Sequence, residues 1–85
     1  MREKLKVKIF WFPATREVFF EGDAVSVSSQ NRLGNFDVLP RHANFITLIF
    51  NKLTVTLPDG KILNYEFKRG VLEVRKNEVK IFLGF

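Results

Sequence analysis

The side chains that most often carry enzyme chemistry are scarce in this sequence. His42 is its only histidine, and the chain contains no cysteine. A nucleophilic triad would need that imidazole beside an activated hydroxyl and an orienting carboxylate, and no nucleophile elbow or comparable motif surrounds it. One imidazole among scattered carboxylates is weak ground for a metal site, and no glycine-rich phosphate loop occurs. We therefore predict a protein that is not an enzyme, with no catalytic residues, no metal and no cofactor, and with His42 at the entry to a strand.

The balance of charge indicates a binding function instead. Fourteen Lys and Arg residues against nine Asp and Glu residues give a formal net charge of +5. Such an excess favours an acidic partner, nucleic acid or an anionic membrane surface. A small basic β-barrel with surface aromatics would suit single-stranded nucleic acid, which is the alternative function. Against it, no ribonucleoprotein aromatic signature is present, and Glu66, Glu73 and Glu78 are interspersed among the lysines.

The sequence shows no recognisable membrane span or secretory leader. Its longest useful apolar run, residues 45–50, is far shorter than the roughly 18 residues of a spanning helix. Lysines recur at every second position of the N-terminal stretch, where a signal peptide needs a continuous apolar segment. With 85 residues, 46% of them hydrophobic, the chain is expected to form a single domain over residues 1–85 in a reducing, cytoplasmic compartment.

The elements that must position any site are strands. At positions 4–12 lysines alternate with apolar residues, which is the pattern of a strand with one solvent face. About nine short strands with frequent turns predict an all-β fold without helices, an antiparallel β-sandwich or flattened barrel. The expected strands cover residues 4–12, 16–21, 24–28, 36–39, 45–50, 53–57, 62–67, 72–74 and 79–83.

Turn residues separate these strands. We expect turns at Gly22-Asp23, at 58–61 and at 76–78, and an exposed loop over the polar residues 28–34. Residues 45–50 carry apolar side chains on both faces, so one face is either an interface or is covered by tight packing of two sheets.

Four ordered segments together resemble the epsilon subunit of F-type ATP synthases, and the resemblance covers nearly the whole chain. Its most specific part is a Leu-Pro-x-His-Ala segment between a loop glycine and a Gly-x-Leu-Glu-Val strand. The residues that carry it are Phe20, Glu21 and Gly22; Gly34, Phe36, Val38, Leu39, Pro40, His42 and Ala43; residues 70–74; and Asn77, Val79, Lys80 and Ile81.

The resemblance implies a sandwich of about ten strands at the foot of a rotating central stalk. One side would contact the gamma subunit and one end the membrane ring of c subunits. It implies a non-catalytic rotor subunit that supports coupling of ion translocation to ATP synthesis, is one copy within a hetero-oligomer and binds no nucleic acid. It would be peripheral at the cytoplasmic face of the inner membrane, and would meet that membrane only through the complex.

The resemblance also assigns contact residues by position. Gamma contacts are expected at Phe12, Ala14, His42 and Thr47. Ring contacts are expected at Arg32, Gly34 and Asn35, in a neutral to basic loop over residues 30–37.

The chain departs from the family at several of these positions. The family usually has Gly-Glu-Phe-Gly, then Pro-Gly-His-Ala-Pro, and later Gly-Gly before the Leu-Glu-Val strand. Here Asn35 replaces the acid, and other residues replace glycine or proline. The residues that replace glycine or proline are Asp37, Arg41, Asn44 and Arg69.

The family usually continues into an inhibitory two-helix hairpin, whose function is not expected of these 85 residues.

Overall fold

The protein is built from strands, as the sequence predicts. The computed structural model describes residues 3–11 and 18–84, and in this part of the chain it contains seven strands and no helix. The strands are β1 (Leu5–Trp11), β2 (Val18–Ala24), β3 (Ser26–Asn31), β4 (Gly34–Val38), β5 (Phe45–Thr56), β6 (Ile62–Arg75) and β7 (Glu78–Leu83).

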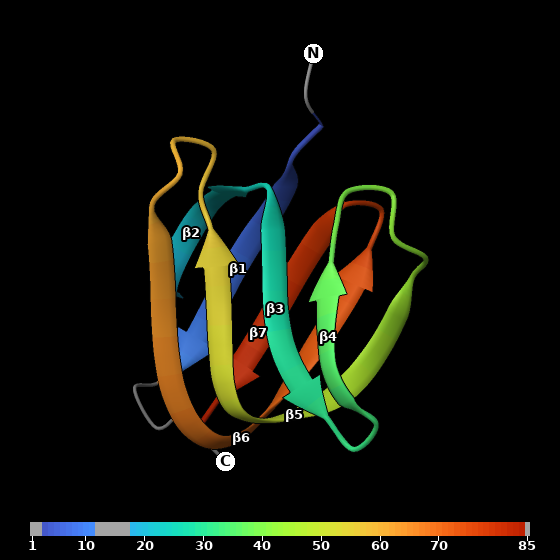
Figure 1. Ribbon diagram of the computed structural model, residues 1–85, viewed down its shortest axis with the longest axis vertical. Helices are drawn as coiled ribbons and strands as arrows, with labels where there is room; N and C mark the ends of the chain where they lie inside the picture. The colour runs from blue at the N-terminus through green and yellow to red at the C-terminus, as the bar shows by residue number, and fades with distance from the viewer. Residues whose placement is uncertain (1–2, 12–17, 85) are drawn as a thin grey trace.

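All of these strands belong to one sheet in the order β2-β1-β7-β6-β5-β3-β4, and the sheet folds over into two layers (Figure 1). β1, β2 and β7 lie in the back layer, and β3 and β4 lie in the front layer. β5 and β6 pass from one layer to the other. The predicted sandwich is therefore confirmed, but its strands are not all antiparallel, because β1 and β7 pair in parallel.

The core lies between the layers and follows the alternation read from the sequence. Every second residue of β1 and of β7 is buried, and the lysines between them point to solvent. The buried hydrophobic residues are Leu5, Val7, Ile9, Ala24, Val27, Val38, Ile49, Leu53, Val55, Leu72, Val74, Val79, Ile81 and Leu83.

Two long bent strands explain why the strand count falls below the expected nine or ten. β5 has 12 residues and β6 has 14, whereas the sequence pattern divided each into two strands. The register of the β5–β6 pair shifts between Phe50 and Asn51, where Asn51 has a positive φ of 75°. At such a bulge the alternation of inward and outward side chains shifts while the backbone pairing continues. The prediction that β5 and β6 are each two separate strands was therefore wrong.

Two further predictions on β2 to β4 are wrong. Gly22 and Asp23 do not form a turn but lie inside β2, where Gly22 pairs with Val7. The polar segment 28–34 is mostly strand, and only Arg32 and Leu33 form a turn between β3 and β4. Serines and asparagines are tolerated here because they face solvent or bond across strands; Ser28 Oγ, for example, donates to Asp37 Oδ1 at 2.6 Å.

The other two predicted turns are confirmed. In the turn after β5, the Leu57 amide donates to the Lys61 carbonyl at 2.8 Å, and Asp59 Oδ1 accepts from the Lys61 amide at 2.9 Å. Lys76 and Asn77 join β6 to β7 with positive φ values of 48° and 64°. Two positive φ values in succession are typical of a tight hairpin whose twist matches its strands.

Candidate interaction surfaces

Residues 45–50 form an open strand edge, which we call the β5 edge. Over the described residues, β5 lies between two neighbouring strands only at 53–56, where β3 pairs with it. At the β5 edge it pairs with β6 alone. Ile46 and Leu48 are 67% and 50% exposed there. An uncharged apolar strand edge is an aggregation risk unless a partner covers it, so this edge has the character of a docking site.

The outer face of the back layer extends this apolar character. Leu48 pairs with Val71, Val71 with Phe82, and Phe82 with Phe10, so these four residues form one row across four strands. The rings of Phe10 and Phe82 stack with centroids 5.1 Å apart and planes inclined by 10°. The sequence signal for this surface was the apolar run 45–50, but only the register shows which residues lie side by side.

Two of the four expected gamma-contact residues lie in or next to the β5 edge: Thr47 is part of it, and His42 lies in the loop just before it. The ring of the exposed His42 lies 5.0 Å from the ring of Phe45. Thr47 is half-buried, and its Oγ1 accepts a hydrogen bond from Asn31 Nδ2 at 3.4 Å and donates to the Leu48 carbonyl at 3.1 Å.

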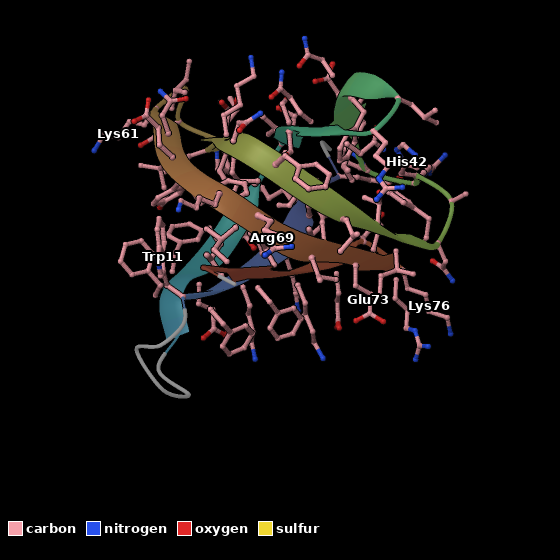
Figure 2. All side chains as sticks on the ribbon, turned by 90° about the horizontal axis from the view of Figure 1, so that it is seen from below. Trp11, His42, Lys61, Arg69, Glu73 and Lys76 are labelled. Atoms are coloured by element: carbon pink, nitrogen blue, oxygen red, sulfur yellow. The ribbon has the colours of Figure 1, made fainter. Side chains whose placement is uncertain are left out.

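The other two expected gamma-contact residues, Phe12 and Ala14, lie outside the described residues. Trp11, the last described residue before them, lies at the opposite side of the molecule from His42 (Figure 2). The part that Phe12 and Ala14 play stays a prediction.

The three expected ring-contact residues lie together in the β3–β4 hairpin. Arg32 is in its turn, and Gly34 and Asn35 begin β4. Gly34 has φ 118°, a conformation that favours glycine. Asn31 fixes the hairpin in two ways, because its Oδ1 accepts from the Leu33 amide at 2.9 Å while its Nδ2 reaches Thr47. The hairpin is therefore fastened to the β5 edge.

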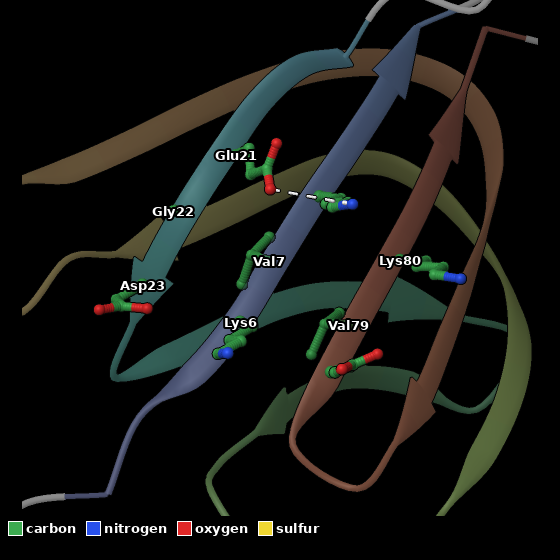
Figure 3. A pocket seen from close by; sticks show the side chains of 9 residues that line it. Lys6, Val7, Glu21, Gly22, Asp23, Val79 and Lys80 are labelled. Atoms are coloured by element: carbon green, nitrogen blue, oxygen red, sulfur yellow. Dashed lines mark ion pairs between the residues drawn. The ribbon is translucent and has the colours of Figure 1, made fainter.

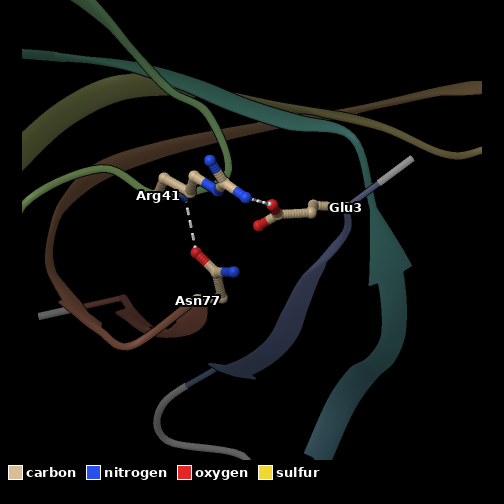
Figure 4. A network of polar contacts seen from close by, with 3 residues as sticks. All are labelled: Glu3, Arg41 and Asn77. Atoms are coloured by element: carbon tan, nitrogen blue, oxygen red, sulfur yellow. Dashed lines mark hydrogen bonds and ion pairs between the residues drawn. The ribbon is translucent and has the colours of Figure 1, made fainter. Parts of the chain in front are cut away.

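The loop that holds His42 is attached to distant parts of the chain. The Arg41 amide donates to Asn77 Oδ1 at 2.7 Å, and the Arg41 guanidinium pairs with Glu3 (Figure 4). Asn44 Oδ1 accepts from the Lys76 amide at 2.9 Å. These positioning residues could not be predicted from the sequence, because the loop and the β6–β7 turn are more than 30 positions apart.

A shallow groove of about 470 Å³ lies on the outer face of β1, β2 and β7 (Figure 3). Its charged lining has both signs, because β1 contributes two lysines, β2 two carboxylates and β7 one of each. Lys8 Nζ lies 3.8 Å from Glu21 Oε2. Three ammonium groups face three carboxylates, so the groove lacks the continuous positive track that single-stranded nucleic acid requires. The charged residues that line it are Lys6, Lys8, Glu21, Asp23, Glu78 and Lys80.

The side of the sandwich away from His42 is closed by aromatic rings. Tyr65 lies 6.3 Å from Trp11 and 5.5 Å from Phe19, centroid to centroid. Burial raises the pKa of Tyr65 above its ordinary value of 10.0 because the phenolate would be desolvated.

In the described residues, no three His, Asp or Glu side chains gather as metal ligands. No helix in that part of the chain has the length and apolar character to cross a bilayer.

The single folded-over sheet and its two-layer core define a β-sandwich domain. A family model described as "ATP synthase, Delta/Epsilon chain, beta-sandwich domain" matches residues 6–83. The chain belongs to this family.

Curated relatives agree with the family assignment. The chain is 32% identical over 69 residues to an ATP synthase epsilon chain of Stenotrophomonas maltophilia, covering 80% of this chain and 49% of the relative. It is 34% identical over 82 residues to an ATP synthase epsilon chain of Clostridium kluyveri, covering 95% and 60%. The chain thus spans about half the length of the Stenotrophomonas protein.

Solved structures share the fold. A chain of the Euglena gracilis mitochondrial ATP synthase, in a structure of OSCP, F1 and c-ring, matches with a TM-score of 0.85 at 16% identity, covering 98% of this chain and 52% of that one. A chain of the Tetrahymena thermophila enzyme, in a structure of central stalk and c-ring, matches with a TM-score of 0.76 at 10% identity, covering 99% and 66%.

Proposed function

We propose that the protein is a non-catalytic central-stalk subunit of an F-type ATP synthase, where it links the gamma subunit to the ring of c subunits. In this role it supports the coupling of ion translocation to ATP synthesis. It works as one copy within the hetero-oligomer, on the cytoplasmic face of the inner membrane. Family membership supports this role, as do the names of its relatives and the stalk and ring assemblies in which its structural neighbours occur.

The observation that carries the proposal is the β5 edge. A free monomer gains nothing from an uncharged open strand with Ile46 and Leu48 exposed, whereas a subunit interface buries such residues at its centre. Thr47, within this edge, and His42, three residues before it, supply polar groups beside an apolar anchor. We assign this edge to the gamma subunit.

The β3–β4 hairpin is the proposed contact with the c-ring. Arg32, Gly34 and Asn35 lie within four positions of one another at one end of the sandwich, and Asn31 fastens the hairpin to the gamma-facing edge. Because β3 of this hairpin also pairs with β5 at residues 53–56, the hairpin and the edge belong to one paired set of strands, which lets one domain hold two partners in a fixed relation. Asn35 adds no negative charge, so the hairpin is suited to an acidic or carbonyl-rich loop of the ring.

Calorimetric titration with the cognate gamma subunit tests the gamma assignment. We expect the protein to bind with a Kd in the micromolar range or below. Leu48→Asp places a charge at the centre of the β5 edge and should weaken binding at least tenfold, because a carboxylate would be desolvated in the interface.

Ile62→Asp is the matched control. Ile62 is 58% exposed, similar to Leu48, but it lies beyond the bend of β6 and pairs with Thr56 in the other layer. It should leave the affinity within twofold of the original. Absence of binding at micromolar concentrations, or equal loss in both variants, would contradict the gamma assignment.

A further inference from the structure

The tip of the β3–β4 hairpin has few backbone connections to the rest of the sandwich. Backbone pairing between β3 and β5 ends at Ser29 and Leu53, and β4 pairs with β3 alone in the described part of the chain. Residues 30–35 are therefore paired in the backbone only with one another. Just beyond Leu53 the register of β5 shifts at its bulge, and the strand bends toward the back layer (Figure 1). From this point on, side chains must hold the hairpin against β5.

Polar side chains connect the base of the hairpin to β5 where the backbone pairing stops. Ser29 Oγ donates to the Lys52 carbonyl at 2.6 Å. Ser29 is 2% exposed and is the only buried polar residue in the described part of the chain, so this bond is shielded from water. Asn51 Nδ2 donates to Gln30 Oε1 at 3.1 Å. Two consecutive residues of β3 thus contact the two residues that follow the bulge of β5.

Two more contacts reach the β5 edge itself. Asn31 Nδ2 donates to Thr47 Oγ1 at 3.4 Å. The ring of Phe36, in β4, lies 6.1 Å from the ring of Phe45 in an edge-to-face arrangement. Phe45 also lies 5.0 Å from the ring of His42, so it contacts both the hairpin and the loop that is expected to meet gamma. We call these contacts the seam, formed by Ser29, Gln30, Asn31 and Phe36 of the hairpin with Phe45, Thr47, Asn51 and Lys52 of β5.

The seam joins two segments that each have little backbone support. The β5 edge has a neighbouring strand on one side only, and the hairpin has none beyond β3 in the described residues. Segments of this kind open locally at a lower free energy than the paired core. Because the seam connects them, an opening of the β5 edge also releases the hairpin. A ligand that binds only the ordered edge therefore makes opening of the hairpin rarer without touching it.

We propose that gamma bound at the β5 edge orders the ring-facing hairpin through the seam. This inference rests on the proposed function and adds that its two contacts are energetically linked. Docking on gamma favours the hairpin conformation that meets the c-ring, and by reciprocity the ring favours docking on gamma. For an opening that the edge and the hairpin share, gamma at ten times its Kd makes the open state about tenfold rarer.

Hydrogen exchange of the hairpin amides, measured by mass spectrometry with and without the cognate gamma subunit, tests the proposal. With gamma at ten times its Kd, exchange in residues 34–38 should slow about tenfold. The turn at 58–61 follows the other end of β5 and makes no contact of the seam. Its exchange should change by less than about twofold, because the seam does not reach it.

Gln30→Ala/Asn31→Ser opens the seam from the hairpin side. The serine still offers an acceptor to the Leu33 amide, but it is too short to reach Thr47. Neither substituted residue is an expected contact of gamma or of the ring, and residues 45–50 are unchanged. Gamma should therefore bind this variant with an affinity close to that of the original protein. The slowing of exchange at 34–38 should fall below about twofold, because the edge and the hairpin then open independently.

Ser28→Ala/Thr54→Ala is the matched control. It also removes two side-chain hydrogen bonds of the front layer, to Asp37 at 2.6 Å and to Asn64 at 2.8 Å, but neither bond belongs to the seam. Each protein is compared with itself in the presence and absence of gamma, so a hairpin that is looser from the start does not affect the comparison. The control should keep the slowing of about tenfold.

Three results would overturn the proposal while leaving the gamma assignment intact. Equal slowing in the seam variant and in the original protein would show that gamma covers the hairpin directly. Loss of slowing in the control as well would show that the seam has no special part. Bound gamma without slowing in the original protein would show that the two surfaces are independent. Absence of gamma binding in the calorimetric titration, in contrast, would remove the gamma assignment and this link together.

Discussion

Arg41 holds a backbone conformation that glycine adopts more easily. Its φ of 68° lies in the left-handed region, which costs a residue with a Cβ about 1 kcal/mol. The family usually has glycine at this position, and the positive φ explains that preference. In return, the Arg41 guanidinium pairs with Glu3 and ties the N-terminal segment to the loop that carries His42. An exposed pair of this kind contributes between nothing and about 1 kcal/mol.

Comparison of Arg41→Gly with Arg41→Ala separates the strain from the ion pair. Both variants lose the pair, but only the glycine relieves the strained φ, so Arg41→Gly should be more stable than Arg41→Ala by about 1 kcal/mol in urea unfolding. Both keep the backbone amide that donates to Asn77. Equal stability of the two variants would show that the loop relaxes from its left-handed conformation without cost.

The bends of β5 and β6 are what close the sheet into a sandwich. At the β6 bend, Gly70 lies against β7. A Cβ there would overlap the carbonyl oxygen of Phe82 and lie 2.9 Å from Leu83 Cδ2. Because a carbonyl in a strand ladder cannot move without breaking its pairing, only glycine fits. Arg69 replaces the first glycine of the family's pair without such a conflict, since it is exposed and its φ is not positive.

Gly70→Ala should therefore destabilise the protein by about 2 kcal/mol or more, as overpacking against backbone does. Gly22→Ala is the matched control in β2, where the nearest atom to the added Cβ is Phe20 Cζ at 3.2 Å, at the end of a side chain that can rotate. That substitution should cost less than about 1 kcal/mol. A cost for Gly70→Ala no larger than that for Gly22→Ala would contradict the close approach of β6 and β7.

Alternation in the sequence was enough to predict β1 and β7, because one buried face forces a period of two. Turn-forming residues were enough to predict the turns at 58–61 and 76–78. Alternation could not predict the continuity of β5 and β6. The bulge at Asn51 shifts the register, and the glycine at position 70 has no side chain to mark its face. The second half of β3 was also missed, since serine and glutamine are typical of loops and only pairing with β4 and β5 makes them strand.

At the scale of the whole molecule, three surfaces have different chemistry. The β5 edge is apolar, and the groove over β1, β2 and β7 is balanced in charge. The end at which the β3–β4 hairpin turns and β5 and β6 bend carries the exposed cations Arg32, Lys52, Lys68 and Arg69. The sequence indicated the first through the run 45–50. It could not indicate the other two, because the charges that gather or cancel there come from strands and turns far apart in the chain. Net charge alone therefore suggested a nucleic-acid alternative that the groove does not favour.

The central claim is that this domain lies between the gamma subunit and the c-ring. Since the chain contains no cysteine, a single cysteine at Asn35 gives one defined crosslinking site. In the assembled ATP synthase, Asn35→Cys carrying a short crosslinker should form adducts with subunit c, because the β3–β4 hairpin is the proposed ring contact. Ile46→Cys, at the β5 edge, should form adducts with gamma in the same preparation. Adducts from position 35 only to gamma or to the catalytic subunits, with none to c, would contradict the account.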